Sequence, residues 1–317
     1  MAEATRVATR QAYGEALAAL GAEYPNLVVL DADLSKSTKT DLFKKKYPER
    51  HVNCGIAESN MMAAAAGIAT TGKIVFASTF AMFAAGRAFE QVRTSIGYTQ
   101  ANVKIGATHA GLSVGEDGAT HQCCEDIALM RTIPGMAVIS PADAVEARAA
   151  VRAAAEHKGP VYLRFGRLPV PVVFDEASYT FAIGKGHVLR SGTDVTLAAT
   201  GLMVEQALDA AKLLANENIS ARVLDIPTIK PIDDALLAAA AQETGAIVTA
   251  EEHNVIGGLG GAVCESVAAS CPVPVLRVGV EDVFGRSGPA ADVLRYYGLT
   301  AEHLVSKAKE AIALKRQ

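Results

Sequence analysis

The chain has no tryptophan, only 5% aromatic residues and no strong excess of either charge sign among its 317 residues. No run of about 18 apolar residues occurs, so the sequence predicts no membrane span. The first residues, Met1 to Ala4, lack the basic and then apolar order of a secretory signal. The 30 basic and 34 acidic residues are spread along the chain without a basic patch. Neither a nucleic acid nor a membrane is therefore expected as a partner.

Disulfide and zinc signatures are lacking as well. The five cysteines include the adjacent pair Cys123 and Cys124, and no CxxC motif occurs. Neighbouring cysteines do not easily form an unstrained bridge. Free thiols fit a reducing compartment. We expect a cytoplasmic protein with no metal ligands of its own.

The composition and the order of segments predict an α/β protein. Half of the residues are hydrophobic, and alanine and valine dominate them, which suits close packing of helices on sheets. The length suggests about two domains of roughly 150 residues each. We expect two consecutive α/β domains, 1–170 and 189–317, joined by a linker at 171–188 that is rich in proline and turn formers.

Apolar periodicity places the expected elements. The expected strands are 27–30, 74–77, 103–109, 137–139, 161–165, 194–199, 221–226, 246–250 and 274–278. The expected helices are 7–21, 58–70, 78–93, 124–132, a helix after 143, 203–216, 233–242, 258–270 and 301–313.

One acid, Glu58, stands in the weakly polar stretch 51–62, which runs into the small residues 63–67. Small residues pack tightly, so Glu58 is expected at the mouth of a buried helix with few charges nearby. A carboxyl group with little access to water has a raised pKa and can share a proton near neutral pH. The alternative is an ordinary acid that the helix dipole favours at a helix N-terminus.

Polar groups also follow the expected strands. Asp33, Ser35 and Ser37 come after the strand at 27–30, at the edge of a parallel sheet where ligands gather, or they form an ordinary turn. The loop 109–122 holds three glycines, two acids and two histidines, a composition typical of functional loops.

Two further features have competing interpretations. Phe80 and Phe83 are three residues apart and are expected on one helical face, either as core or as a wall for a flat heteroaromatic ring. The glycine-rich turn 257–261 reads GGLGG, which is not the GxGxxG register of a nucleotide site. Close packing of a helix on a strand is the favoured interpretation of that turn.

Four sequence blocks together carry a family resemblance. They are Val7-Ala8-Thr9-Arg10-Gln11, Gly55-Ile56-Ala57-Glu58-Ser59-Asn60-Met61, Ser78-Thr79-Phe80-Ala81-Met82-Phe83 and Gly115-Glu116-Asp117-Gly118-Ala119-Thr120-His121-Gln122. In this order they resemble the C-terminal half of transketolase, and most closely the stand-alone C-terminal subunit of split transketolases. The resemblance covers about residues 4 to 312. It implies a pyrimidine-binding domain followed by the transketolase C-terminal domain.

The resemblance also implies a cofactor and a partner. Thiamine diphosphate lies between such a chain and a diphosphate-binding half, whose GDG…N motif holds Mg²⁺, or Ca²⁺ or Mn²⁺. No GDG occurs here, since the nearest candidate is the EDG of the polar loop. We expect a separate N-terminal subunit with that motif, inactivity of this chain alone, and an assembly with two copies of each subunit.

Residue roles carry over on matching positions. Glu58 resembles the carboxyl group that hydrogen-bonds N1′ of the aminopyrimidine, which assists removal of the proton from thiazolium C2. Phe80 and Phe83 resemble the aromatic wall around the pyrimidine, and Asp33 an acid near the cofactor. Asp117 resembles the acid that reads a substrate hydroxyl, and His121 a catalytic histidine near the donor's terminal hydroxyl.

Arg10, Ser37, His109 and Arg167 resemble the cluster that binds the sugar phosphate, for which Arg and His donors are suited. On the residues alone, Arg10 could also be a helix-surface charge and Arg167 part of a linker salt bridge.

The sequence departs from the family pattern after Phe83, where single-chain transketolases usually have a tyrosine. The segment Arg87-Ala88-Phe89-Glu90-Gln91 is closer to the RAYDQ pattern of deoxyxylulose-phosphate synthase. A second alternative is the β subunit of a 2-oxo acid dehydrogenase, which lacks the GEDGATHQ loop. A third is a non-catalytic scaffold, which would have no use for Glu58, Phe83, Asp117 and His121 together.

Overall fold

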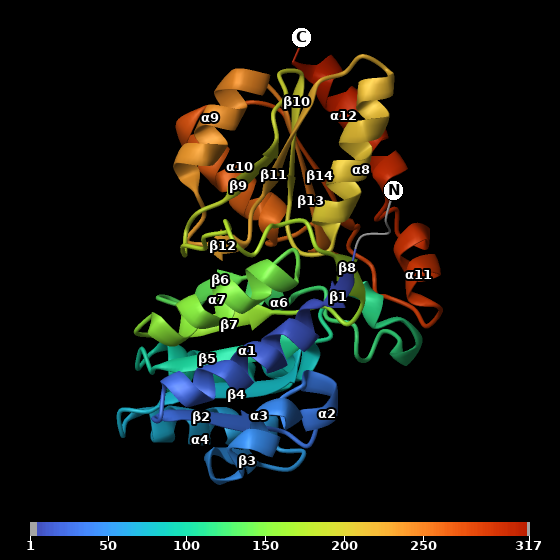
Figure 1. Cartoon of the computed structure of the whole chain (residues 1–317). Coiled ribbons are helices and arrows are strands. Elements are labelled where there is room, and N and C mark those ends of the chain that lie inside the picture. Colours follow the sequence, from blue (N-terminus) through green and yellow to red (C-terminus); the bar gives the residue numbers. More distant parts are fainter. Residues whose placement is uncertain (1–4, 316–317) are drawn as a thin grey trace.

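Two parallel sheets, each covered by helices on both faces, organise residues 5–315, which the computed structural model describes (Figure 1). The expectation about a signal sequence concerns residues 1–4 and lies outside the described residues. The two expected α/β domains are confirmed, and the second domain is stacked on the first. Among residues 5–315, no helix is long and apolar enough to cross a membrane.

The first sheet has seven strands in the order β12-β6-β7-β5-β4-β2-β3. All of its neighbours run parallel except β12, which pairs antiparallel with β6. The strands are β2 (Leu27–Asp31), β3 (His51–Asn53), β4 (Ile74–Phe80), β5 (Val103–Thr108), β6 (Ala137–Ile139), β7 (Val161–Arg164) and β12 (Thr228–Lys230). The strands β4 and β5 are completely buried, as expected for a parallel sheet covered on both faces.

Alanine-rich helices cover this sheet closely. One face carries α1 (Thr9–Glu23), α3 (Asp41–Lys46) and α7 (Ala144–Glu156), whose apolar residues share a core with β2 and β7. The other face carries α4 (Glu58–Ala69), α5 (Phe89–Gln91) and α6 (Asp126–Arg131). A short antiparallel pair, β1 (Arg6–Ala8) with β8 (Pro169–Pro171), lies at the end of α1.

The second sheet has the order β14-β13-β10-β11-β9, and only β9 is antiparallel. Its strands are β9 (His187–Arg190), β10 (Val195–Ala199), β11 (Ala221–Asp225), β13 (Ile247–Asn254) and β14 (Val275–Val280). Its helices are α8 (Met203–Asn216), α9 (Asp234–Thr244), α10 (Leu259–Ser270), α11 (Ala290–Tyr296) and α12 (Ala301–Leu314).

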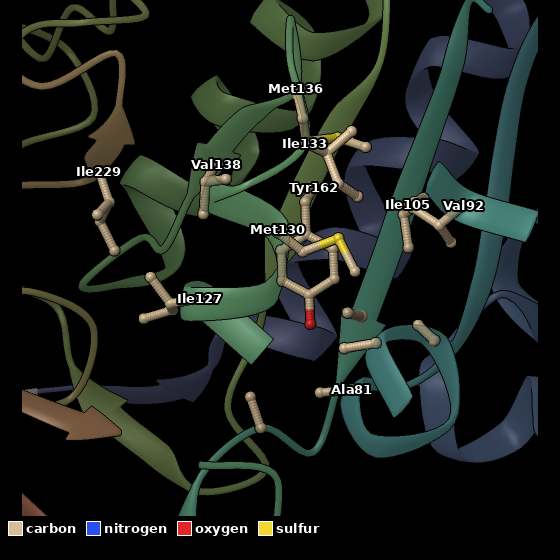
Figure 2. Close-up of a cluster of buried hydrophobic side chains, with 14 of the residues drawn as sticks. Ala81, Val92, Ile105, Ile127, Met130, Ile133, Met136, Val138, Tyr162 and Ile229 are labelled. Carbon is tan, nitrogen blue, oxygen red and sulfur yellow. The ribbon is translucent and has the colours of Figure 1, made fainter. Parts of the chain in front are cut away.

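The two domains share one apolar core at their junction. Tyr162 of β7 is buried beside Met130 and Ile127 of α6, and Ile229 of β12 reaches the same cluster from the C-terminal half of the chain (Figure 2). Leu237 of α9 belongs to this cluster too. The second domain therefore contributes both a strand and core residues to the first.

The helix expected at 78–93 is wrong in its first part. The strand β4 continues to Phe80 because Phe80 still pairs with Thr108 of β5 in the ladder. Wide π-helical turns follow at Met82–Arg87 and Val92–Gly97, on either side of α5. Periodicity also failed to predict the short elements β1, β3, β8, β9, β12, α2 (Ser35–Thr38), α3 and α11.

Candidate functional site

The carboxyl ends of β2, β4 and β5 bring most of the expected site residues to one edge of the first sheet. Asp33 follows β2, Phe80 ends β4 and His109 follows β5. These three strands are neighbours in the sheet, so their ends meet at one place. Among residues 5–315, no group of three or more His, Cys, Asp or Glu side chains is arranged to hold a metal ion.

Glu58 is the first residue of α4, and its side chain is only 1% exposed. The expectation of few charges nearby is wrong, because Nη1 of Arg87 lies 2.8 Å from Oε2 of Glu58. The same guanidinium lies 4.4 Å from the ring centre of Phe83. Arg87 itself is half exposed. The planar guanidinium of Arg87 thus binds the carboxylate of Glu58 and covers the face of the Phe83 ring.

Three stacked rings and a fourth ring packed edge-on lie beside this pair. Phe80 is 7% exposed. Its ring centre lies 3.8 Å from the ring centre of His109 and 5.8 Å from that of Phe83. His121 meets Phe83 edge-on at 5.4 Å. The expectation that Phe80 and Phe83 share a helical face is wrong, since one ends a strand and the other lies in a π-helical turn, but their rings do stack.

His109 is buried and held on both ring nitrogens. Its Nε2 lies 3.2 Å from Nη1 of Arg10, and its Nδ1 lies 2.9 Å from the hydroxyl of Thr108. Because arginine only donates, Nε2 of His109 accepts and Nδ1 carries the proton. Burial, and then the charges of Arg10 and Arg167, lower the pKa of His109 to about 3. His109 is therefore a neutral acceptor that orients Arg10.

Arg10 and Arg167 converge near His109. Arg10 donates to the carbonyl of Ser37 at 2.9 Å, and burial followed by the charge of Arg167 lowers the pKa of Arg10. Its Nε is buried and has no hydrogen-bond partner among the described residues. Arg167 donates to the carbonyl of Val114 and binds Oε2 of Glu116 at 2.9 Å. Two neighbouring guanidinium groups with an unpaired buried N–H form a site suited to an anion.

Asp33 and Asp117 lie at the rim of this edge. Asp33 is exposed, has a left-handed backbone (φ 64°), and accepts from the amide of Asn53 at 2.9 Å. Asp117 is exposed at the end of the 3₁₀ segment Leu112–Asp117. Within residues 5–315, no ion pair or hydrogen bond joins Asp117 to the ring stack. His121, by contrast, contacts the stack directly.

Sequence reasoning missed two polar side chains of this edge. Arg87 was visible only as part of the RAFEQ segment, and its reach to Glu58 depends on the π-helical turn that precedes it. Asp31 is fully buried and accepts from the hydroxyls of Thr38 and Thr40 at 2.7 and 2.9 Å, while burial raises its pKa. These hydroxyls come from the last residue of α2 and from the residue just before α3, two short helices that the apolar periodicity does not predict.

In the glycine-rich turn of the second domain, a side chain of the same domain accepts the hydrogen bonds of two backbone amides. The carboxylate of Glu251 accepts from the amides of Leu259 and Gly260, at 2.6 and 2.8 Å, at the start of α10. A side chain at Gly258 would come within 2.0 Å of that carboxylate. The packing interpretation is confirmed, because an internal acid occupies the donors that a phosphate would need.

Family comparisons cover nearly the whole chain. Residues 5–172 match the transketolase pyrimidine binding domain, and residues 184–304 match the transketolase C-terminal domain. A putative transketolase C-terminal section from Methanocaldococcus jannaschii is 52% identical over 303 residues, which are 95% of each chain. The 6-deoxy-6-sulfo-D-fructose transketolase subunit SqwH of Clostridium sp. is 42% identical, over 95% of this chain and 93% of its own length.

Solved structures agree with these relatives. A chain described as "Split gene transketolase, inactive beta4 tetramer" superposes with a TM-score of 0.91 at 55% identity, covering 98% of this chain and 100% of that one. Transketolase from Leishmania mexicana superposes with a TM-score of 0.83 at 27% identity, covering 98% of this chain but 46% of that one.

Proposed function

Because the chain belongs to the transketolase family, as the C-terminal subunit of a split transketolase, we propose that it supplies half of an active site for two-carbon transfer. In this proposal a glycolaldehyde unit passes from a ketose phosphate to an aldose phosphate with the help of thiamine diphosphate. The observation that carries the proposal is that one guanidinium, that of Arg87, pairs with the buried Glu58 carboxylate and also lies over the ring face of Phe83. No contact among residues 5–315 favours the dehydrogenase subunit or the synthase.

The residues around Glu58 fit a flat nitrogen heterocycle. The Arg87 guanidinium is planar, donates N–H to Glu58 and lies over Phe83, and an aminopyrimidine with a proton on N1′ presents the same features. When bound, thiamine diphosphate would supply a nucleophilic carbon that adds to the ketose carbonyl and an acceptor for the electron pair released when the adjacent carbon–carbon bond breaks. Glu58 would hydrogen-bond N1′, while Phe83 and Phe80 form the wall along the ring. Arg87 has to turn aside, which its half-exposed side chain permits.

Asp33 is assigned a supporting role at the rim of the cofactor site. Its carboxylate is held in place at the end of β2 by the side-chain amide of Asn53. The role proposed for Asp33 is therefore to shape the entrance to the cofactor site.

The polar loop is assigned to the sugar. Asp117 is exposed and can accept from a substrate hydroxyl next to the carbonyl. The His121 ring lies edge-on to Phe83. Its Nδ1 forms a hydrogen bond with the hydroxyl of Thr120 at 2.9 Å. Its Nε2 is then the atom that would exchange a proton with the donor's terminal hydroxyl.

Arg10 and Arg167 are assigned to the phosphate group of the sugar. The buried, unpaired Nε of Arg10 provides a donor that an incoming anion would satisfy. Ser37 fixes Arg10 through its carbonyl, and His109 fixes it through Nε2. His109 therefore acts as a support for Arg10 in this arrangement, in place of the direct donor to the phosphate that the resemblance implies.

The other half of the site belongs to a separate subunit. We assign the diphosphate and its metal (Mg²⁺, Ca²⁺ or Mn²⁺) to a partner with a GDG…N motif, and we expect two copies of each chain in the active assembly. The tetramer named for the 55% identical structure is described as inactive and contains β subunits, which supports the need for a partner.

Reconstitution tests the proposal. The chain is mixed with its N-terminal partner and assayed with xylulose 5-phosphate and ribose 5-phosphate, with 6-deoxy-6-sulfo-D-fructose as an additional donor because a relative is named for it. Activity is expected from the mixture and from neither chain alone. Turnover by this chain alone, or none from the mixture with any donor in the presence of cofactor and metal, would contradict the proposal.

A further inference from the structure

The C-terminal domain contacts the polar loop 109–122. The segment between β14 and α11, together with α11 itself, lies against the 3₁₀ segment Leu112–Asp117 (Figure 1). The base of the loop is buried at Leu112, Ser113 and Val114, whereas Glu116 and Asp117 are exposed. The loop thus presents its acids to solvent and its base to the second domain.

Gln122 ties the two ends of the loop to the second domain. Its side chain is only 4% exposed, and its Nε2 lies 2.9 Å from the carbonyl of Arg286. The same nitrogen lies 3.2 and 3.3 Å from the carbonyls of Leu112 and Gly115. One amide with two N–H groups therefore serves three carbonyl groups, two in the loop and one in the second domain.

Gly285 makes this approach possible. A Cβ atom at Gly285 would lie 1.8 Å from Oε1 of Gln122 and 2.8 Å from Leu112. A Cβ at Gly118 would likewise lie 2.3 Å from the hydroxyl oxygen of Ser287. Both sides of this contact therefore need glycine, which indicates a fitted interface between the loop and the second domain.

Glu252 of β13 holds the other end of the loop. Its buried carboxylate accepts from the amide of Ser113, and a Cβ at Gly111 would lie 2.3 Å from its carboxyl carbon. The carbonyl of Glu252 accepts from Arg164 at 2.8 Å, and Arg164 forms a buried ion pair with Asp126 at 2.8 Å. Burial raises the pKa of Glu252 to about 7. The loop is thus anchored through the second domain to the core of the first.

We propose that the C-terminal domain positions the substrate-reading loop, with Gln122 and Glu252 as its positioning residues. This inference rests on the proposed function, because it takes Asp117 and His121 of the loop as the side chains that read the sugar. His121 directly precedes Gln122 in the chain, so a shift of Gln122 displaces the imidazole. A displacement of about 1 Å at such a side chain lowers rates by up to about 100-fold.

The test uses two variants that remove the Gln122 contact by different means. Gln122→Met keeps the length of the side chain without its N–H groups, and Gly285→Ala pushes the amide away. The matched control is Gln206→Met, which removes an amide that accepts from Ala301 inside the second domain at 3.0 Å. Each variant is measured as the isolated chain and as the reconstituted pair.

In the isolated chain, the amides of 111–122 are expected to exchange hydrogen about fivefold faster in both test variants, with no change in the control. This measurement needs no activity, so it stands even where the proposed function fails. Unchanged exchange at 111–122 in both variants would overturn the proposal.

In the reconstituted pair, both test variants are expected to lower kcat/KM about tenfold and to narrow the ratio of kcat/KM between two ketose phosphates epimeric beside the carbonyl. Thiamine diphosphate affinity is expected to stay within twofold of the parent. Glu252→Leu is expected to lower kcat/KM and narrow the epimer ratio as the two test variants do. Glu252→Gln is expected to keep the epimer ratio of the parent, because its amide oxygen still accepts from the amide of Ser113. An unchanged ratio in an active pair would overturn the proposal.

Discussion

The two sheets of this protein have the same parallel architecture, but they treat the carboxyl ends of their strands differently. In the first domain, the edge carries a buried carboxylate, Glu58, whose bound guanidinium comes from the half-exposed Arg87. In the second, the carboxylate of Glu251 accepts from two backbone amides of α10. One acid has a partner that can move away, and the other has partners that are fixed in a helix.

This difference separates a binding site from a structural element. A displaceable partner leaves room for a ligand with the same hydrogen-bonding pattern, whereas fixed amides leave none. The first edge also carries the unpaired buried Nε of Arg10. We therefore expect substitution of Glu58 to change catalysis and substitution of Glu251 to change stability.

The largest effect is expected at Glu58. Glu58→Gln in the reconstituted pair should lower kcat about 100-fold or more, because a positioned acid is lost. The denaturation midpoint of the isolated chain and its association with the partner should remain close to those of the parent. Turnover within fivefold of the parent would show that Glu58 is only a helix N-terminal acid.

A smaller effect is expected at Arg167. Arg167→Met should raise KM for a phosphorylated donor about 10-fold to 100-fold, since charge-assisted hydrogen bonds to a phosphate are lost. KM for a ketose donor that carries no phosphate group should change little. Arg152→Met is the matched control, because Arg152 pairs with Glu23 on the surface of α7 and α1. Equal increases of KM for the phosphorylated and the unphosphorylated donor would show that Arg167 does not bind the phosphate group.

The smallest effect on catalysis is expected at Glu251. Glu251→Gln should lower the free energy of unfolding by about 1–3 kcal/mol, because its side-chain NH₂ would face one of the two amide donors of α10. Urea unfolding of the isolated chain measures this change. The kcat of the folded, reconstituted variant should match the parent. A loss of kcat comparable with that of Glu58→Gln would remove the distinction between the two edges.

Much of this architecture could be predicted from the sequence. Long periodic segments predicted both ends of α8 correctly, and the strands β10 and β11 with an error of one residue each. Short elements were missed, because three residues of β12 carry no periodicity and pair with β6 only through the tertiary arrangement. The end of β4 was misjudged because the ladder with β5, and not local propensity, extends the strand to Phe80.

The sequence predicted which residues form the candidate site better than it predicted the contacts between them. Motif resemblance brought Glu58, Phe83 and His121 together, and the structure places these side chains near Arg87 or the ring stack. The guanidinium of Arg87 could not be placed, since its reach depends on the geometry of a π-helical turn. The neutral state of His109 follows from its burial beside Arg10, which a sequence does not display.

Titration of thiamine diphosphate, followed by calorimetry in the presence of Mg²⁺, tests most directly whether this chain holds one end of a shared cofactor. Saturable binding is expected for the mixture with the partner and not for either chain alone. Glu58→Ala in the mixture should weaken that binding about tenfold or more, through the loss of a charge-assisted hydrogen bond. Tight binding to this chain alone, or unchanged affinity of the Glu58→Ala mixture, would contradict the account.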